Sequence, residues 1–252
     1  MSYLLVTGTD TDVGKTWVAA LLLRQLVARG IRVAAYKPAC SGADFDAAGV
    51  PIWRDVDALA GAAKFTGDPH VICPQTFLAP LAPNLAAKLE GRRVNDALLV
   101  DAFHRTAEHA DVAVVEGAGG LLSPLSDEST NADLAVRLNL PLIIVAANRL
   151  GVINHTLLTI EAARHRQLQI LSVVLNDVAP RLSQPDEETS RSASGSSDSP
   201  PESSSASAIE HNAAELGRLL HDVPLFECRF EATHVTPMNV AAQQVKLPYA
   251  MS

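Results

Sequence analysis

The sequence of 252 residues predicts one doubly wound α/β domain, with a mostly parallel sheet covered by helices on both faces. Two observations predict this class. Short apolar runs alternate along the chain with segments of helical period, which is the order of βαβ units. The apolar runs are also continuous, as in parallel strands that are buried on both faces. Ligands of such sheets bind at the carboxyl ends of the strands.

The expected elements follow one another in this alternating order. A strand at residues 3–7 leads into a helix at residues 15–29, whose apolar residues recur at helical spacing until Gly30 ends it. Further strands are expected at residues 31–36, 112–115, 142–147 and 170–175, with a short apolar stretch at 223–226. Further helices are expected at residues 55–64, 94–109, 131–139, 155–166 and 208–221.

The composition excludes several function classes. Hydrophobic residues make up 48% of the chain, enough for a sizeable core. The formal net charge of −8 argues against a nucleic-acid binder and against docking to anionic membranes. No apolar run reaches about 18 residues and no basic region precedes the first strand, so neither a transmembrane helix nor a signal peptide is expected. Three cysteines without a CxxC or zinc pattern indicate a reducing, cytoplasmic compartment.

Residues 183–207 differ from the rest of the single domain, which spans residues 1–252. This segment holds eleven serines, three prolines and no aromatic residue, and its acids supply −4 of the net charge. It has too little apolar surface to offset the entropy of ordering, so we expect a disordered surface insertion. A loop without function is favoured over a phosphorylated regulatory segment, because serine richness alone is weak evidence for regulation.

The strongest motif is GTDTDVGKT at residues 8–16, which follows a strand and opens a helix. Glycines let the backbone wrap a phosphate, and the helix N-terminus offers partial positive charge. Lys15 would reach the terminal phosphates, and the Thr16 hydroxyl would bind Mg²⁺. Five residues separate Gly8 from Gly14 where the standard motif has four. The strand and helix around it nevertheless favour a phosphate loop over a structural turn.

Two further motifs lie at strand ends. Lys37 and Ser41 belong to KPACSG after the second strand, where both could project over the sheet. Spacing alone does not distinguish a functional Lys37 from a solvated one. Glu116 opens EGAGG after the strand at 112–115, as a Walker B acid does next to a phosphate loop. A glycine turn with a solvated glutamate is the less favoured interpretation.

Magnesium requires oxygen ligands, and a third carboxylate is expected from residues 43–60. The periodicity does not choose among the candidates Asp44, Asp46, Asp55 and Asp57. At the end of the strand at 170–175, Asn176 precedes Asp177. An amide offers a donor and an acceptor side by side, which suits adenine. An Asx turn is the alternative.

These motifs together resemble the dethiobiotin synthetase family. The resemblance is carried by residues 8–16, 36–42, 57–59, 116–120, 124–127, 150–155 and 176–177. It implies a fold like that of P-loop NTPases and a Mg²⁺- and ATP-dependent ligase of biotin biosynthesis. Such a ligase joins 7,8-diaminononanoate, CO₂ or bicarbonate, and ATP into the cyclic urea of dethiobiotin, through a carbamate and its mixed anhydride with phosphate.

The resemblance also implies roles for individual residues. The catalytic group would consist of Lys37, Lys15 and Thr11. The nucleotide would be bound by Asp12, Val13, Gly14, Lys15, Thr16, Trp17, Glu116, Gly117, Ala118, Gly119, Asn176, Asp177, Pro224, Leu225 and Phe226. The magnesium ligands would be Thr16, Asp57 and Glu116. Ser41 would contact the diamine, and Gly151 and Asn154 would reach the substrate of a partner subunit, which implies a homodimer.

Two features depart from the pattern of the family. One is the serine-rich segment, and the other is the late apolar stretch, which lacks the usual preceding glycine.

Two other functions are possible for these motifs. One alternative is a nucleotide-switched partitioning ATPase of the same fold. Those proteins carry a second lysine early in the loop, whereas this loop has Asp10 and no lysine before Lys15. Another alternative is a different synthetase of the superfamily, because only the resemblance indicates the diamine.

Overall fold

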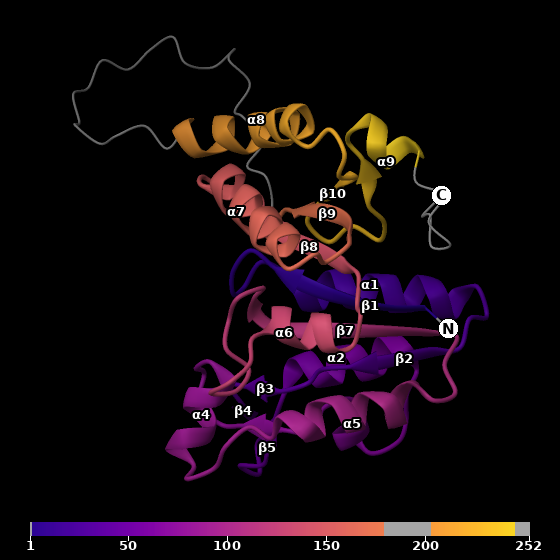
Figure 1. Ribbon diagram of the computed structural model, residues 1–252, viewed down its shortest axis with the longest axis vertical. Coiled ribbons are helices and arrows are strands. Elements are labelled where there is room, and N and C mark those ends of the chain that lie inside the picture. The colour runs from indigo at the N-terminus through magenta and orange to yellow at the C-terminus, as the bar shows by residue number, and fades with distance from the viewer. Residues whose placement is uncertain (1, 179–202, 245–252) are drawn as a thin grey trace.

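The computed structural model describes residues 2–178 and 203–244 (Figure 1). Within these residues, the main sheet has seven strands in the order β11-β10-β9-β8-β1-β7-β2. Its parallel strands are β1 (Ser2–Gly8), β2 (Val33–Tyr36), β7 (Val112–Gly120), β8 (Leu142–Ala147), β9 (Ile170–Asn176) and β10 (Leu225–Cys228). The edge strand β11 (Thr236–Pro237) is antiparallel to β10. The predicted doubly wound α/β fold is confirmed.

Helices cover both faces of the sheet, and successive residues of β1 face opposite ways. Leu4 and Val6 pack in one core cluster with α1 (Lys15–Ala28), α2 (Arg54–Ala63) and α3 (Pro69–Ile72). Leu5 packs in the other cluster. The helices of that second face are α4 (Pro83–Leu89), α5 (Asp96–Ala107), α6 (Asn131–Arg137), α7 (Val152–His165) and α8 (Ser203–Leu219). The strands are continuous apolar runs because both faces are buried.

The position of β1 creates the site for a ligand. β1 lies between β7 and β8, and the chain leaves it toward β2 on one side and later returns to β8 on the other. The order of strands therefore reverses at β1, and such a switch point opens a crevice at the carboxyl ends of the strands. The glycine loop follows β1, and Gly8 is in register with Gly120 of β7.

Several short elements were not predicted. β3 (Cys40–Ser41) pairs with β6 (Thr76–Phe77), and β4 (Asp44–Phe45) pairs with β5 (Pro51–Ile52). Helices α3 and α4, and α9 (Val240–Gln244) near the end of the described chain, were also missed. Each of these elements is too short to show a period in the sequence.

The boundaries of two predicted segments change. The disorder expected at residues 183–207 does not extend over residues 203–207, because α8 begins at Ser203, and residues 183–202 lie outside the described residues. Ala213 and Leu216 anchor α8 in the core. Adding residues to an anchored helix costs little. The last apolar stretch, expected at 223–226, overlaps strand β10, which spans Leu225–Cys228. In the described part of the chain, no helix is long and apolar enough to cross a membrane.

Candidate active site

The glycine loop ends in a left-handed residue that begins helix α1. Gly14 has a φ of +88°, and a Cβ there would come within 2.1 Å of the Asn176 Nδ2 atom. Glycine is therefore required by the backbone conformation and by the close approach of Asn176. The Lys15 ammonium is buried and donates to the Asp10 carbonyl oxygen at 2.9 Å. Burial lowers the pKa of Lys15, although Glu116 opposes this effect.

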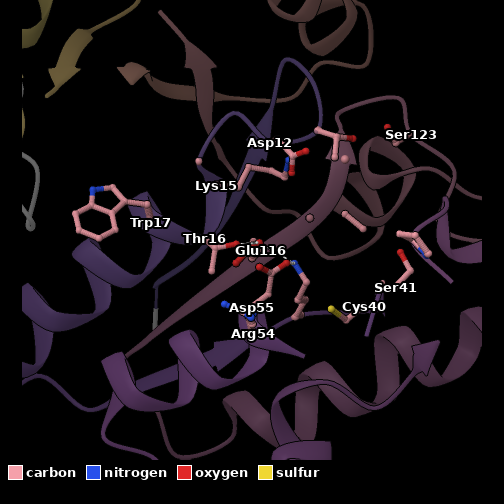
Figure 2. Close-up of a pocket in the computed structure, with 18 of the residues that line it drawn as sticks. Asp12, Lys15, Thr16, Trp17, Cys40, Ser41, Arg54, Asp55, Glu116 and Ser123 are labelled. Atoms are coloured by element: carbon pink, nitrogen blue, oxygen red, sulfur yellow. Dashed lines mark hydrogen bonds and ion pairs between the residues drawn. The ribbon is translucent and has the colours of Figure 1, made fainter. Parts of the chain in front are cut away.

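A cavity of about 910 Å³ opens at the carboxyl ends of the strands (Figure 2). Trp17 and Ser41 lie toward opposite ends of it, with Thr16 and Glu116 between them. The predicted site residues that line it are Thr11, Asp12, Gly14, Lys15, Thr16, Trp17, Lys37, Ser41, Glu116, Gly117, Ala118, Gly119, Asn176 and Asp177. The fold thus brings together residues from four separate motifs.

The floor of this cavity is a buried charged cluster. The Lys37 ammonium lies 2.7 Å from Glu116 Oε1 and 2.9 Å from Asp55 Oδ2. The Thr16 hydroxyl donates to the same Glu116 oxygen at 2.7 Å. Lys37 is 3% exposed and Glu116 is 1% exposed. The Lys37 side chain is therefore buried and paired rather than solvated.

Burial and neighbouring charges shift the pKa values of the cluster residues in opposite directions. Burial disfavours the Lys37 ammonium, but the charges of Glu116 and Asp55 outweigh it and raise the pKa of Lys37 above its ordinary value. Burial also disfavours the Asp55 carboxylate, but Lys37 outweighs it and lowers the pKa of Asp55. Burial raises the pKa of Glu116 against the pull of Lys37. At neutral pH the cluster thus holds a fixed cation facing the cavity.

The same cluster fits a magnesium ion. Glu116 Oε2 is buried and has no hydrogen-bond partner among the described residues. With Asp55 and the Thr16 hydroxyl, it makes a set of hard oxygen donors, which Mg²⁺ prefers. The described residues include no group of three or more His, Cys, Asp or Glu side chains that could hold a metal. Magnesium needs no such cage, because it is usually bound by one or two carboxylates with waters and substrate phosphates.

The aspartate of this cluster is Asp55, not Asp57. Asp57 is exposed and does not line the cavity. Residues two apart on a helix do not share a face, so α2 turns Asp55 toward Lys37 and Asp57 away. The expectation that Asp57 reaches the metal position is therefore wrong. The sequence had left Asp55 among four candidates for the third carboxylate. The orientation of α2 about its axis places Asp55 in the cluster.

The expectation that the late apolar stretch lines the nucleotide site is also corrected. Pro224, Leu225 and Phe226 do not line the cavity. β10 runs parallel to β9, and its last residue, Cys228, is in register with Asn176. The residues that follow β10 are therefore the ones at the carboxyl edge, and Phe230 and Glu231 line the cavity there.

Three other predicted positions also lie outside the cavity lining. The Val13 side chain is buried beneath the loop, and its carbonyl oxygen accepts a hydrogen bond from Asn176 Nδ2 at 3.0 Å. Gly151 and Asn154 are exposed at the start of α7 and do not line this chain's own cavity. Their expected contact with a partner subunit's substrate stays a prediction.

Several lining residues were missed by the sequence analysis. Arg54 lines the cavity beside Asp55 (Figure 2). Residues 80–83 line it near Ser41, whose hydroxyl donates to the Leu81 carbonyl oxygen at 2.5 Å. The two prolines at 80 and 83 were the available signal, because they mark a turn. Cys40 also lines the cavity, and burial raises the pKa of its thiol to about 12. It stays protonated at neutral pH, as expected of a packing residue.

Comparisons with known proteins agree with this geometry. A family model described as an AAA domain matches residues 2–214. An ATP-dependent dethiobiotin synthetase from Anaeromyxobacter dehalogenans (strain 2CP-C) is 43% identical over 225 residues, which are 89% of this chain and 88% of that protein. Another from Anaeromyxobacter sp. (strain Fw109-5) is 47% identical over 176 residues, 70% of this chain and 77% of that protein.

The chain belongs to the dethiobiotin synthetase family. Membership places it among the ATP-dependent ligases of biotin biosynthesis, in agreement with the resemblance, and decides against a partitioning ATPase. Among solved structures, the cell division protein FtsY from Thermotoga maritima covers 96% of this chain and 66% of that chain, with 17% identity and a TM-score of 0.42. An ATP-dependent ligase needs a site for its nucleotide, and the cavity at the glycine loop is the candidate active site of this chain.

Proposed function

We propose that this protein forms the cyclic urea of dethiobiotin from 7,8-diaminononanoate, CO₂ and Mg-ATP. The observation that carries the proposal is the buried Lys37 ammonium, held by Glu116 and Asp55 beside the phosphate loop. A fixed cation buried at the floor of the cavity suits a reaction between two anions, a carbamate and a γ-phosphate. The relatives named ATP-dependent dethiobiotin synthetases support the same reaction.

The proposed chemistry has three steps. One substrate amine adds to CO₂ and loses a proton, which gives a carbamate. A carbamate oxygen then attacks the γ-phosphorus, so that ADP leaves and a carbamic–phosphoric mixed anhydride forms. The second amine attacks the carbamoyl carbon, a proton is lost, and phosphate leaves as the urea ring closes. No step needs a protein nucleophile.

The chain's own residues would position and neutralise these anions. Lys15 would leave the Asp10 carbonyl and bind the terminal phosphates, with Lys37 and Thr11 beside the reacting groups. Thr16, Asp55 and Glu116 would hold Mg²⁺, which supplies positive charge to the phosphates. Holding the carbamate in line with the γ-phosphate contributes further by proximity.

The proposal includes a homodimer. Ser41 lies at the end of the cavity opposite Trp17 and would contact the diamine there. Gly151 and Asn154 are exposed outside the cavity, which supports a role toward the substrate of a second copy. Backbone N–H groups at the start of α7 would suit the substrate carboxylate.

The decisive experiment is product formation. Purified protein is incubated with the diamine, bicarbonate and Mg-ATP, and the cyclic urea is sought by mass spectrometry, with ADP release measured in parallel. We expect both products, in equal amounts, and almost no ADP release when the diamine is left out. ATP hydrolysis at the same rate with and without the diamine, and no urea product, would contradict the proposed function.

Two neighbouring aspartates on α2 provide a matched test of the proposed metal site. Asp55→Asn should raise the Mg²⁺ concentration needed for half-maximal activity by about tenfold, the lower end of the effect of disturbing a metal site. Asp57→Asn removes the same charge from the same helix but not from the cavity, so its Mg²⁺ titration should match that of the unmodified protein. Equal titrations for the two variants would argue against Asp55 as a ligand.

A further inference from the structure

A chain of buried polar side chains connects helix α8 to one end of the cavity. Asn212 of α8 donates from Nδ2 to Asn148 Oδ1 at 3.0 Å. Asn148 in turn donates from Nδ2 to Asp177 Oδ1 at 2.9 Å. Asn148, Asp177 and Asn212 are 4%, 5% and 6% exposed. Of these three residues only Asp177 lines the cavity, so neither asparagine contacts a ligand there directly.

Asn148 is held in a single orientation by its partners. Its amide nitrogen also donates to the Ile209 carbonyl oxygen at 3.3 Å, so both amide hydrogens and the amide oxygen have partners. Its backbone N–H donates to the Asn176 carbonyl oxygen at 2.8 Å. A rotation of this side chain would leave several buried polar groups unpaired, which is costly. Asn148 therefore contacts both residues of the Asn176–Asp177 pair and fixes them relative to α8.

The carboxylate that this network orients has a restricted chemistry. An ionised carboxylate accepts hydrogen bonds and donates none. The Asp177 carboxylate therefore suits an N–H donor, such as the amino group of a nucleotide base. Trp17, Val178 and Phe230 line the same cavity and offer apolar surface to the flat face of a base.

We infer that Asn148, held by Asn212, positions Asp177 to accept a hydrogen bond from the amino group of adenine. Asn148 and Asn212 are thus positioning residues for base selection, and α8 takes part in nucleotide recognition without touching the nucleotide. The inference rests on the proposed binding of the base at Asn176 and Asp177.

Binding measurements with two nucleotides test this role. The full chain is titrated calorimetrically with Mg²⁺ and either a non-hydrolysable ATP analogue or the same analogue of purine riboside, which lacks only the amino group. Asn148→Ala should weaken binding of the ATP analogue by about tenfold, as for a hydrogen bond with a charged group, and leave the purine riboside analogue within about twofold. The KM for ATP should rise in parallel, while kcat and the KM for the diamine stay within about twofold.

Asn212→Ala is a second variant that leaves the strand ends intact. This variant should weaken binding of the ATP analogue by about threefold. The double variant should bind the analogue no more weakly than Asn148→Ala, because the two residues act through the same series of hydrogen bonds. Asn239→Ala is the matched control. Its amide donates to the Leu220 and Val223 carbonyl oxygens outside the cavity, so it should lower the melting temperature without changing either affinity.

The outcomes separate the inference from the proposed function. An equal loss of affinity for both analogues in Asn148→Ala, or no loss for either, would overturn the inference. A merely structural residue would not discriminate between the two bases. Unmodified protein that binds the ATP analogue but makes no dethiobiotin would contradict the proposed function, and the two binding constants would still decide the role of Asn148.

Discussion

Replacing Lys37 by leucine is expected to lower kcat by about 10²–10³-fold, the effect of losing one preorganised electrostatic group. The Lys37 ammonium is buried and fixed by Glu116 and Asp55, so it meets the developing negative charge without reorganising. Leucine fills a similar volume and carries no charge. The measurement is the initial rate of urea formation at saturating diamine and Mg-ATP.

The stability of this variant must be measured together with its activity. Removing the cation leaves the Glu116 and Asp55 carboxylates without their partner, and breaking a buried ion pair costs about 3–5 kcal/mol. Rates are therefore expressed per folded protein, as determined by circular dichroism. Lys88→Leu is the control, because Lys88 pairs with Asp127 on the surface and lines no part of the cavity. A folded Lys37→Leu variant with unchanged turnover would remove Lys37 from the catalytic group.

Replacing Glu116 by glutamine is expected to raise the half-saturating Mg²⁺ concentration by at least tenfold, the lower bound for disturbing a metal site. The two side chains have the same shape, and a glutamine oxygen could still accept the Thr16 hydroxyl. The variant loses the negative charge that opposes Lys37 and the buried oxygen that has no described partner. The effect should therefore appear in the Mg²⁺ titration at fixed ATP.

A control separates a metal effect from a general loss of charge. Glu90 accepts the Leu78 backbone N–H and pairs with Arg92 outside the cavity. Glu90→Gln should therefore titrate with Mg²⁺ like the unmodified protein. If the Glu116→Gln titration coincided with that of Glu90→Gln, the position of Glu116 beside Thr16 would have to serve charge balance rather than metal binding.

Much of the fold was predictable because its signals are local. Strands buried on both faces must be continuous apolar runs, and those runs located β1, β8, β9 and the start of β7. The end of β7 was missed, because this strand continues through the glycine motif to Gly120. The glycine loop, Lys37 and Glu116 each follow such a run directly. Since parallel strands end at one edge of the sheet, predicting the strands was enough to predict that these residues meet.

The errors arose where a site depends on how an element is oriented. Asp55 and Asp57 have the same chemistry and nearly the same position in the sequence, and only the packing of α2 against the sheet turns one of them toward Lys37. Residues 224–226 and Phe230 lie close together in the chain, and the register of β10 with β9 decides which of them reach the cavity.

The amino-acid sequence alone was sufficient for the α/β class, the glycine loop and the residue types of the charged cluster. The apolar period, the placement of glycines and the ends of strands are all encoded within short segments. The choice of Asp55, the cavity-lining residues after β10, and the link from Asn212 through Asn148 to Asp177 came only from the folded chain. Asn148 is 29 residues from Asp177 and 64 residues from Asn212. Hydrogen bonds across such separations depend on helix phase and strand register, which are set when the core packs and leave no periodic trace in the sequence.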